Sequence, residues 1–124
     1  MVIVKNNGII VMNRGDTWES SIFCNLGNKI NPIKYSLTNN DTLYFGVMQA
    51  NTPFDNSLIC KKLTKNDEVS GLEGHYKISF NHEDTMHVMP GNYYYEVKLV
   101  RNDPINDTNK VDTIIPRTKF VILE

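Results

Sequence analysis

The stretch that decides the fold is residues 93–100, which read YYYEVKLV. Side chains along a β-strand point alternately to the two faces of a sheet. One face of this stretch therefore carries Tyr93, Tyr95, Val97 and Leu99, and the other carries Tyr94, Glu96, Lys98 and Val100. The first set is apolar or aromatic and the second is mixed, which is typical of a strand with one buried face. We expect a long strand here, with the first set in the core.

Strand-like patterns recur along the rest of the chain, separated by turn signals. They cover residues 1–5, 9–12, 17–24, 35–37, 42–49, 57–63, 75–80, 111–115 and 118–123. Asn7 and Gly8 predict a hairpin between the first two, because these residues tolerate the positive φ angles of a tight turn. Lys61 and Lys62 indicate an edge strand, since charge there discourages pairing with another chain. Residues 101–110 are expected to form a loop.

The composition also favours β-structure. The chain has 124 residues, a length that predicts a single domain over residues 1–124. It contains one alanine and sixteen asparagines, whereas alanine is the best helix former and asparagine prefers turns. The sequence therefore predicts an all-β, immunoglobulin-like antiparallel β-sandwich of about seven to nine strands. One short helical turn is expected over residues 82–88, where Asn81 can cap it.

The remaining predicted core side chains come from two of these segments. They are Trp18, Ile22, Cys24, Leu43, Phe45 and Val47. In residues 75–80 the alternation places Tyr76, Ile78 and Phe80 together on one face.

Charge and hydropathy argue against two classes of partner. Thirteen Lys and Arg residues oppose fourteen Asp and Glu residues, which leaves a net charge of −1 at pH 7. Nucleic-acid binding by phosphate neutralisation needs a concentrated positive face, and the sequence has no basic run. No apolar stretch approaches the roughly 20 residues that span a bilayer. The first eight residues also lack the apolar core of a signal peptide. We expect neither a nucleic-acid nor a membrane partner.

Residues that could carry chemistry are few and scattered. His82 and His87 are five positions apart, whereas the metalloprotease motif places two histidines four apart on one helix face. Cys24 and Cys60 lie in strand-like runs and are either buried thiols or a disulfide pair. The sequence contains no Gly-x-Ser-x-Gly elbow and no glycine-rich phosphate loop. It predicts no catalytic residue, no metal ion and no cofactor, and therefore no enzyme.

One set of side chains indicates a contact surface. The alternation directs Phe23, Tyr44, Met48 and Tyr94 away from the predicted core. If no second sheet covers these faces, the four side chains form an apolar and aromatic patch suited to a protein partner. The competing interpretation is that one of these strands has the opposite face in the core.

Several short segments also share a pattern. Residues 14–18 read RGDTW and open a strand, and residues 84–85 read DT. Residues 90–97 read PGNYYYEV, and residues 112–116 and 119–124 read DTIIP and KFVILE. Together these segments resemble the immunoglobulin-like N-terminal domain of phage upper baseplate proteins.

The resemblance implies a non-enzymatic virion structural protein, a tail, baseplate or head-fibre adaptor, without a cofactor. Its partners would be other virion proteins, namely tail, baseplate or fibre components, in a homo-oligomer or symmetric multi-copy assembly. It would be located in the virion, after assembly in the cytoplasm of the bacterial host. The alternative function is a stand-alone immunoglobulin-like carbohydrate-binding module, in which Tyr44, Tyr94 or Trp18 would stack on sugar rings.

Overall fold

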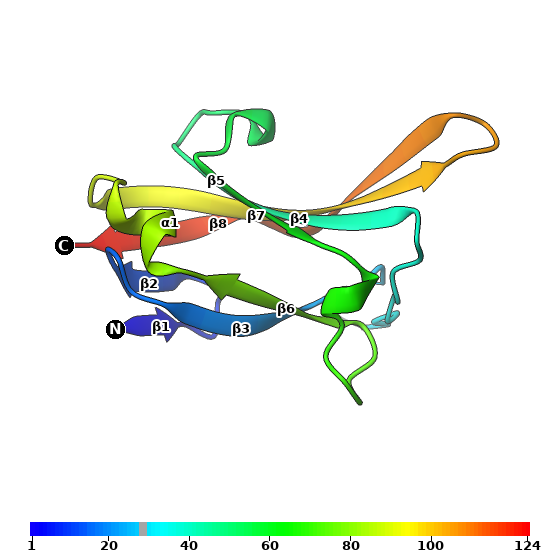
Figure 1. Ribbon diagram of the computed structural model, residues 1–124, viewed down its shortest axis with the longest axis horizontal. Coiled ribbons are helices and arrows are strands. Elements are labelled where there is room, and N and C mark those ends of the chain that lie inside the picture. Colours follow the sequence, from blue (N-terminus) through cyan, green and yellow to red (C-terminus); the bar gives the residue numbers. More distant parts are fainter. Residues whose placement is uncertain (28–29) are drawn as a thin grey trace.

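The computed structural model describes residues 1–27 and 30–124, and most of them lie in β-strands (Figure 1). The strands are β1 (Val2–Val4), β2 (Ile10–Asn13), β3 (Trp18–Phe23), β4 (Asp41–Met48), β5 (Ile59–Leu63), β6 (His75–Phe80), β7 (Gly91–Asp103) and β8 (Thr108–Leu123). The short helices are η1 (Phe54–Asn56), η2 (Lys65–Asp67) and α1 (His82–Met86). The prediction of an all-β protein with one helical turn near residues 82–88 is confirmed.

The strands form two sheets that pack face to face. Six of them make one sheet in the order β1-β2-β8-β7-β4-β5, and β3 and β6 make the second. Neighbouring strands run antiparallel except β2 and β8, which run parallel. The predicted β-sandwich is confirmed, but the prediction that all its strand pairs are antiparallel is wrong for β2 and β8. In Figure 1 the end of the β7–β8 hairpin projects beyond the rest of the molecule.

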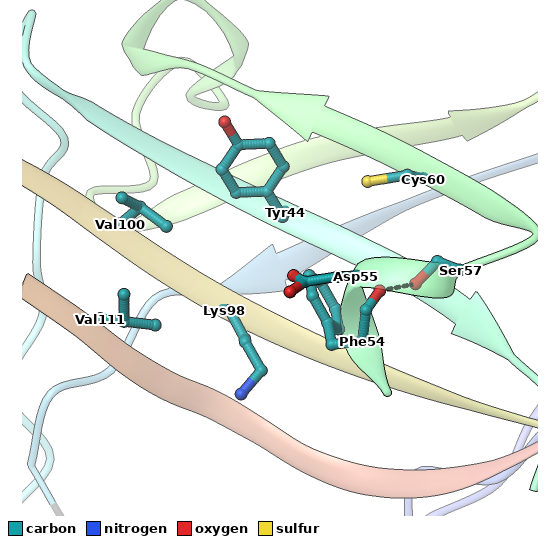
Figure 2. Close-up of a pocket in the computed structure, with 8 residues that line it drawn as sticks. All are labelled: Tyr44, Phe54, Asp55, Ser57, Cys60, Lys98, Val100 and Val111. Atoms are coloured by element: carbon teal, nitrogen blue, oxygen red, sulfur yellow. Dashed lines mark hydrogen bonds between the residues drawn. The ribbon is translucent and has the colours of Figure 1, made fainter. Parts of the chain in front are cut away.

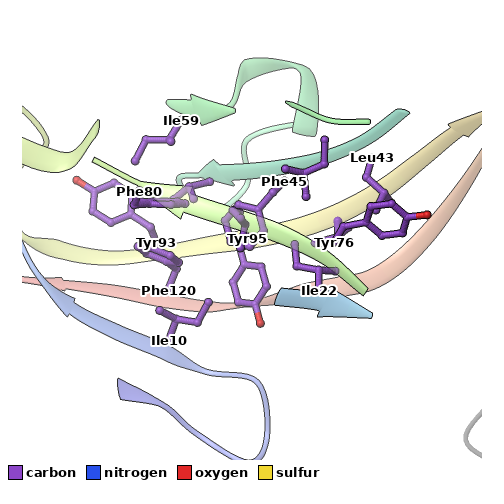
Figure 3. Close-up of a cluster of buried hydrophobic side chains, with 14 of the residues drawn as sticks. Ile10, Ile22, Leu43, Phe45, Ile59, Tyr76, Phe80, Tyr93, Tyr95 and Phe120 are labelled. Atoms are coloured by element: carbon purple, nitrogen blue, oxygen red, sulfur yellow. The ribbon is translucent and has the colours of Figure 1, made fainter. Parts of the chain in front are cut away.

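The core lies between the two sheets and is rich in aromatic rings (Figure 3). Phe45 of β4 stacks on Tyr95 of β7 with ring centroids 5.0 Å apart. Trp18 of β3 packs edge-on against Phe80 of β6, with centroids 5.4 Å apart. Along β7 the inward set predicted from the sequence is buried and the alternate residues from Tyr94 to Val100 are half-buried. The other predicted core residues are also buried, except Trp18, which is half-buried against the core, and the face shared by Tyr76, Ile78 and Phe80 is buried as well.

The turns and edges follow the local sequence. The β1–β2 hairpin turns through Gly8, whose φ of 88° is accessible to glycine at little cost. Strand β5 is an edge strand, as its lysines predict. The Lys61 ammonium lies 2.6 Å from the Asp84 carboxylate, which also accepts a 2.6 Å hydrogen bond from the Asn81 N–H. This ion pair therefore joins the edge strand β5 to the first turn of α1.

The turn at residues 14–16 is held by contacts at the same end of the sandwich. The Gly15 N–H donates a 2.8 Å hydrogen bond to Oγ1 of Thr85, a fully buried residue of α1. The His82 Nδ1 lies 2.7 Å from the Gly15 carbonyl oxygen, and the Asp16 carboxylate pairs with the N-terminal ammonium. The turn is thus fixed between α1 and the first residue of the chain.

Three segments differ from the expectation. The predicted loop at 101–110 is mostly strand, because β7 continues to Asp103 and β8 begins at Thr108. Residues 111–123 form one strand despite Pro116, which lies at a register shift where a missing N–H leaves the ladder little affected. Residues 35–37 form no strand, although the Tyr35 N–H donates a 3.0 Å hydrogen bond to the Cys24 carbonyl.

Candidate functional site

The outer face of the six-stranded sheet, which points away from β3 and β6, carries a hollow of about 340 Å³ (Figure 2). Its lining is Tyr44, Phe54, Asp55, Ser57, Cys60, Lys98, Val100 and Val111, and we call these eight residues the outer hollow. They come from β4, β5, β7, β8, η1 and the residue that follows η1. The surface is mainly aromatic and aliphatic, and Val111 is 55% exposed. The fold thus leaves an apolar depression open to solvent.

Gly46 makes room for one wall of the outer hollow. A Cβ atom at this position would lie 2.7 Å from Cε2 of Phe54 and 2.5 Å from Oγ of Ser57. Both distances are shorter than van der Waals contact, so only glycine lets η1 approach the sheet this closely. The Ser57 hydroxyl in turn donates a 2.6 Å hydrogen bond to the Phe54 carbonyl. Together these contacts place the Phe54 ring directly above the strand.

Arg117 of β8 fastens the segment that leads into η1. Its Nε donates a 2.7 Å hydrogen bond to Glu96, and its Nη2 donates a 2.8 Å bond to the carbonyl of Thr52. The same Nη2 lies 2.9 Å from Sδ of Met48. One guanidinium therefore ties the β4–β5 connection to two strands of the sheet.

Two lysines flank Tyr44 in the sheet. Tyr44 pairs with Lys62 of β5 on one side and with Lys98 of β7 on the other. Side chains directly opposite each other on one face lie about 5 Å apart at Cβ. The Lys98 ammonium lies 5.6 Å from the centre of the Phe54 ring and 3.5 Å from Glu96. Lys62 is exposed and forms no ion pair with any residue of the described ranges.

The two cysteines occupy different environments and are both free thiols. Cys60 is exposed on the rim of the outer hollow, and partial burial raises the pKa of its thiol. Cys24 is fully buried, and loss of hydration raises its pKa to about 11. The disulfide alternative is therefore wrong, and the prediction of a buried thiol is confirmed for Cys24 but wrong for Cys60. Only Cys60 is accessible to a reagent in solvent.

The predicted contact residues do not form one patch. Tyr44 and Tyr94 are half-buried on the outer face of the six-stranded sheet, but Phe23 belongs to the second sheet and stacks on His75 at 5.0 Å. Met48 does face away from the core, but it is fully buried beneath Arg117 and the β4–β5 connection. Phe23 and Met48 face away from the core, as the alternation predicts, but they do not join Tyr44 and Tyr94 in one exposed patch. Alternation cannot show which sheet a strand joins or what a loop covers.

Sequence reasoning also missed residues that shape the site. Phe54 and Asp55 lie between the predicted strands 42–49 and 57–63, where the sequence predicts no contact surface, and it predicts none for Cys60. Gly46 was the available signal, since a glycine inside a strand indicates the close approach of another segment. The alternation predicts that Val100 faces outward. Its cross-strand partner Val111 belongs to β8, and the sequence alone does not place β8 beside β7.

The described residues show no group of three His, Cys, Asp or Glu side chains placed to hold a metal ion. No helix in that part of the chain is long and apolar enough to cross a membrane. No protein-family model, no curated protein and no solved structure matches the sequence or the fold.

Proposed function

We propose that the chain is a non-enzymatic structural protein of a phage virion, a tail, baseplate or head-fibre adaptor that acts through protein–protein contacts. The observation that carries the contact function is the outer hollow, an exposed apolar depression on a sheet face. Aromatic residues are enriched in the cores of protein interfaces, and Tyr44 and Phe54 supply two rings here. Tyr44 lies on β4, and the close approach of η1 at Gly46 places Phe54 above that strand, so both rings are in position before a partner binds. A pre-formed site limits the conformational entropy lost on binding.

The virion assignment is supported by the segments that resemble phage upper baseplate domains. Two of them meet in space, because Gly15 of the RGDTW segment bonds to Thr85 of the DT segment at 2.8 Å. A third joins them at the same end, where the Arg14 N–H donates a 2.7 Å hydrogen bond to the carbonyl of Leu123. The segments on which the proposed resemblance rests therefore contact one another in the folded chain.

Mass spectrometry of purified particles tests this proposal. The phage that encodes the chain is grown, and its virions are purified by density gradient and digested. We expect peptides of this chain at a fixed ratio to the major tail or head proteins, while abundant host cytoplasmic proteins are depleted by the same purification. Absence of the chain from the particles would contradict the virion assignment.

A further inference from the structure

We propose that the outer hollow binds an apolar side chain carried by an acidic segment of a protein partner. This inference rests on the contact function proposed above and adds the chemistry of the partner. It follows from two properties of the outer face, namely an apolar lining of limited size and the lysines on both sides of Tyr44, of which Lys62 has no carboxylate partner in the described part of the chain.

The apolar lining sets the size and character of the group that enters. The volume of about 340 Å³ lies at the lower end of the roughly 300–1,000 Å³ typical of ligand pockets. Figure 2 shows Tyr44 and Phe54 on different sides of this space, with Val100 and Val111 together at one end. A single aromatic or branched aliphatic side chain would contact both rings and both valines. Such an anchor in a pre-formed pocket is the arrangement that dominates binding energy at interfaces.

The charges around Tyr44 determine whether an acidic or a basic partner segment fits. Its cross-strand neighbours on both sides are lysines, and Lys62 has no carboxylate partner in the described part of the chain. Acidic groups beside the anchor would lie next to these ammonium groups, whereas a basic segment would be repelled.

Asp55 then fixes the orientation of that segment. Its carboxylate is exposed on the η1 side of the outer hollow and forms no ion pair with any described residue. An acidic segment would keep its own carboxylates away from η1 and place them over β5, where Lys62 lies, because the Lys98 ammonium of β7 already has Glu96 at 3.5 Å. Complementary charge of this kind chiefly contributes specificity and a faster association rate.

The test is a titration of the full-length, isotopically labelled chain with two synthetic peptides, followed by NMR. One peptide has a single tryptophan between two pairs of aspartates, and the other has lysines in place of the aspartates. We expect saturable shifts at residues of the outer hollow with the acidic peptide, and binding at least tenfold weaker with the basic one. The acidic peptide should also slow N-ethylmaleimide labelling of Cys60, while buried Cys24 stays unlabelled in both cases.

Matched charge reversals complete the test. Lys62→Glu should weaken binding of the acidic peptide at least fivefold, whereas Lys5→Glu, in the exposed β1–β2 turn, should leave it unchanged. Equal affinity for both peptides, shifts away from the outer hollow, or no saturable binding at millimolar peptide would overturn the proposal. Binding of a neutral oligosaccharide in the same place, without the acidic peptide, would also overturn it. Failure here leaves the particle analysis unaffected, and absence from particles leaves the peptide result standing, so the two proposals fail separately.

Discussion

The carboxylate of Glu68 accepts a 3.1 Å hydrogen bond from the hydroxyl of Tyr76, a fully buried residue of β6. It also accepts bonds from the Gly74 N–H at 3.2 Å and the Ser36 hydroxyl at 3.0 Å. The bond from Gly74, followed by those from Ser36 and Tyr76, lowers the pKa of Glu68 below its usual value of 4.5. The ionised form is therefore favoured in the folded protein.

A folded-state pKa below the unfolded value gives stability that is present above pH 4.5 and lost as the pH falls through the folded pKa. Glu68→Gln should lower the urea midpoint at pH 7 and flatten its decline under acidic conditions. Urea unfolding at a series of pH values measures this. Glu73→Gln, at an exposed position in the same turn region, should keep the wild-type pH profile. Parallel profiles for wild type and Glu68→Gln would contradict the prediction.

Gly46→Ala should displace η1 from the sheet. The added methyl group would meet the Phe54 ring and the Ser57 hydroxyl, and overpacking of this kind costs about 1–3 kcal/mol. Chemical denaturation measures the loss, and Cys60 should become faster to label as its surroundings open. In a Phe54→Ala background the same substitution should cost less, because one of the two clashing groups is gone. Equal costs in both backgrounds would show that Phe54 does not cause the strain.

Thr85→Val should destabilise the turn at residues 14–16. Valine keeps the shape of this fully buried side chain but cannot accept the hydrogen bond from Gly15. An unsatisfied buried N–H costs about 1–3 kcal/mol. Thermal and urea unfolding should show this loss, with Thr108→Val as the control at an exposed strand position. If the two variants lose equal stability, the hydrogen bond from the Gly15 N–H to Thr85 makes no measurable contribution to the free energy of unfolding.

The Lys61–Asp84 pair should couple energetically, because each side chain is only 21% exposed. We expect Asp84→Asn to cost more than Lys61→Met, since Asp84 also accepts the Asn81 N–H at the start of α1. A double-mutant cycle should give a coupling of about 1 kcal/mol, at the upper end for a partly exposed pair. If the effects of the two substitutions are additive, Lys61 and Asp84 do not stabilise each other, and the ion pair does not couple β5 to α1.

The sequence predicts strands best where one face is buried along their whole length. From Tyr93 to Val100, strand β7 alternates between buried odd-numbered residues, which face the second sheet, and half-buried even-numbered residues on the outer face. The alternation breaks in β4 after Phe45. From there on the strand is covered on both sides, so Gly46 and Met48 on the outer face are buried as well as Val47 on the inner face. That burial comes from η1 and Arg117, and the approach of a distant segment leaves no periodic signal in the strand that it covers.

The projecting hairpin was missed for a different reason. Residues 101–110 are rich in Asn and Asp, which favour turns when no partner strand is specified. In the structure Arg101 pairs with Lys110 across the ladder, and its guanidinium lies 2.5 Å from Asp112. Cross-strand pairing thus overrides local propensity here. The same limit applies to the outer hollow, whose residues come from four strands, a short helix and the residue that follows it.

The parallel pairing of β2 with β8 has a consequence for synthesis. Ile10 pairs with Phe120, so the ladder joins residues from opposite ends of the chain. Strand β8 also lies between β2 and β7, and the larger sheet cannot be assembled without it. Contacts this distant in sequence slow folding, because the loop must close before they form. A ribosome-bound chain lacking β8 should therefore remain protease-sensitive, and the sandwich should fold only after residues 108–123 have left the exit tunnel.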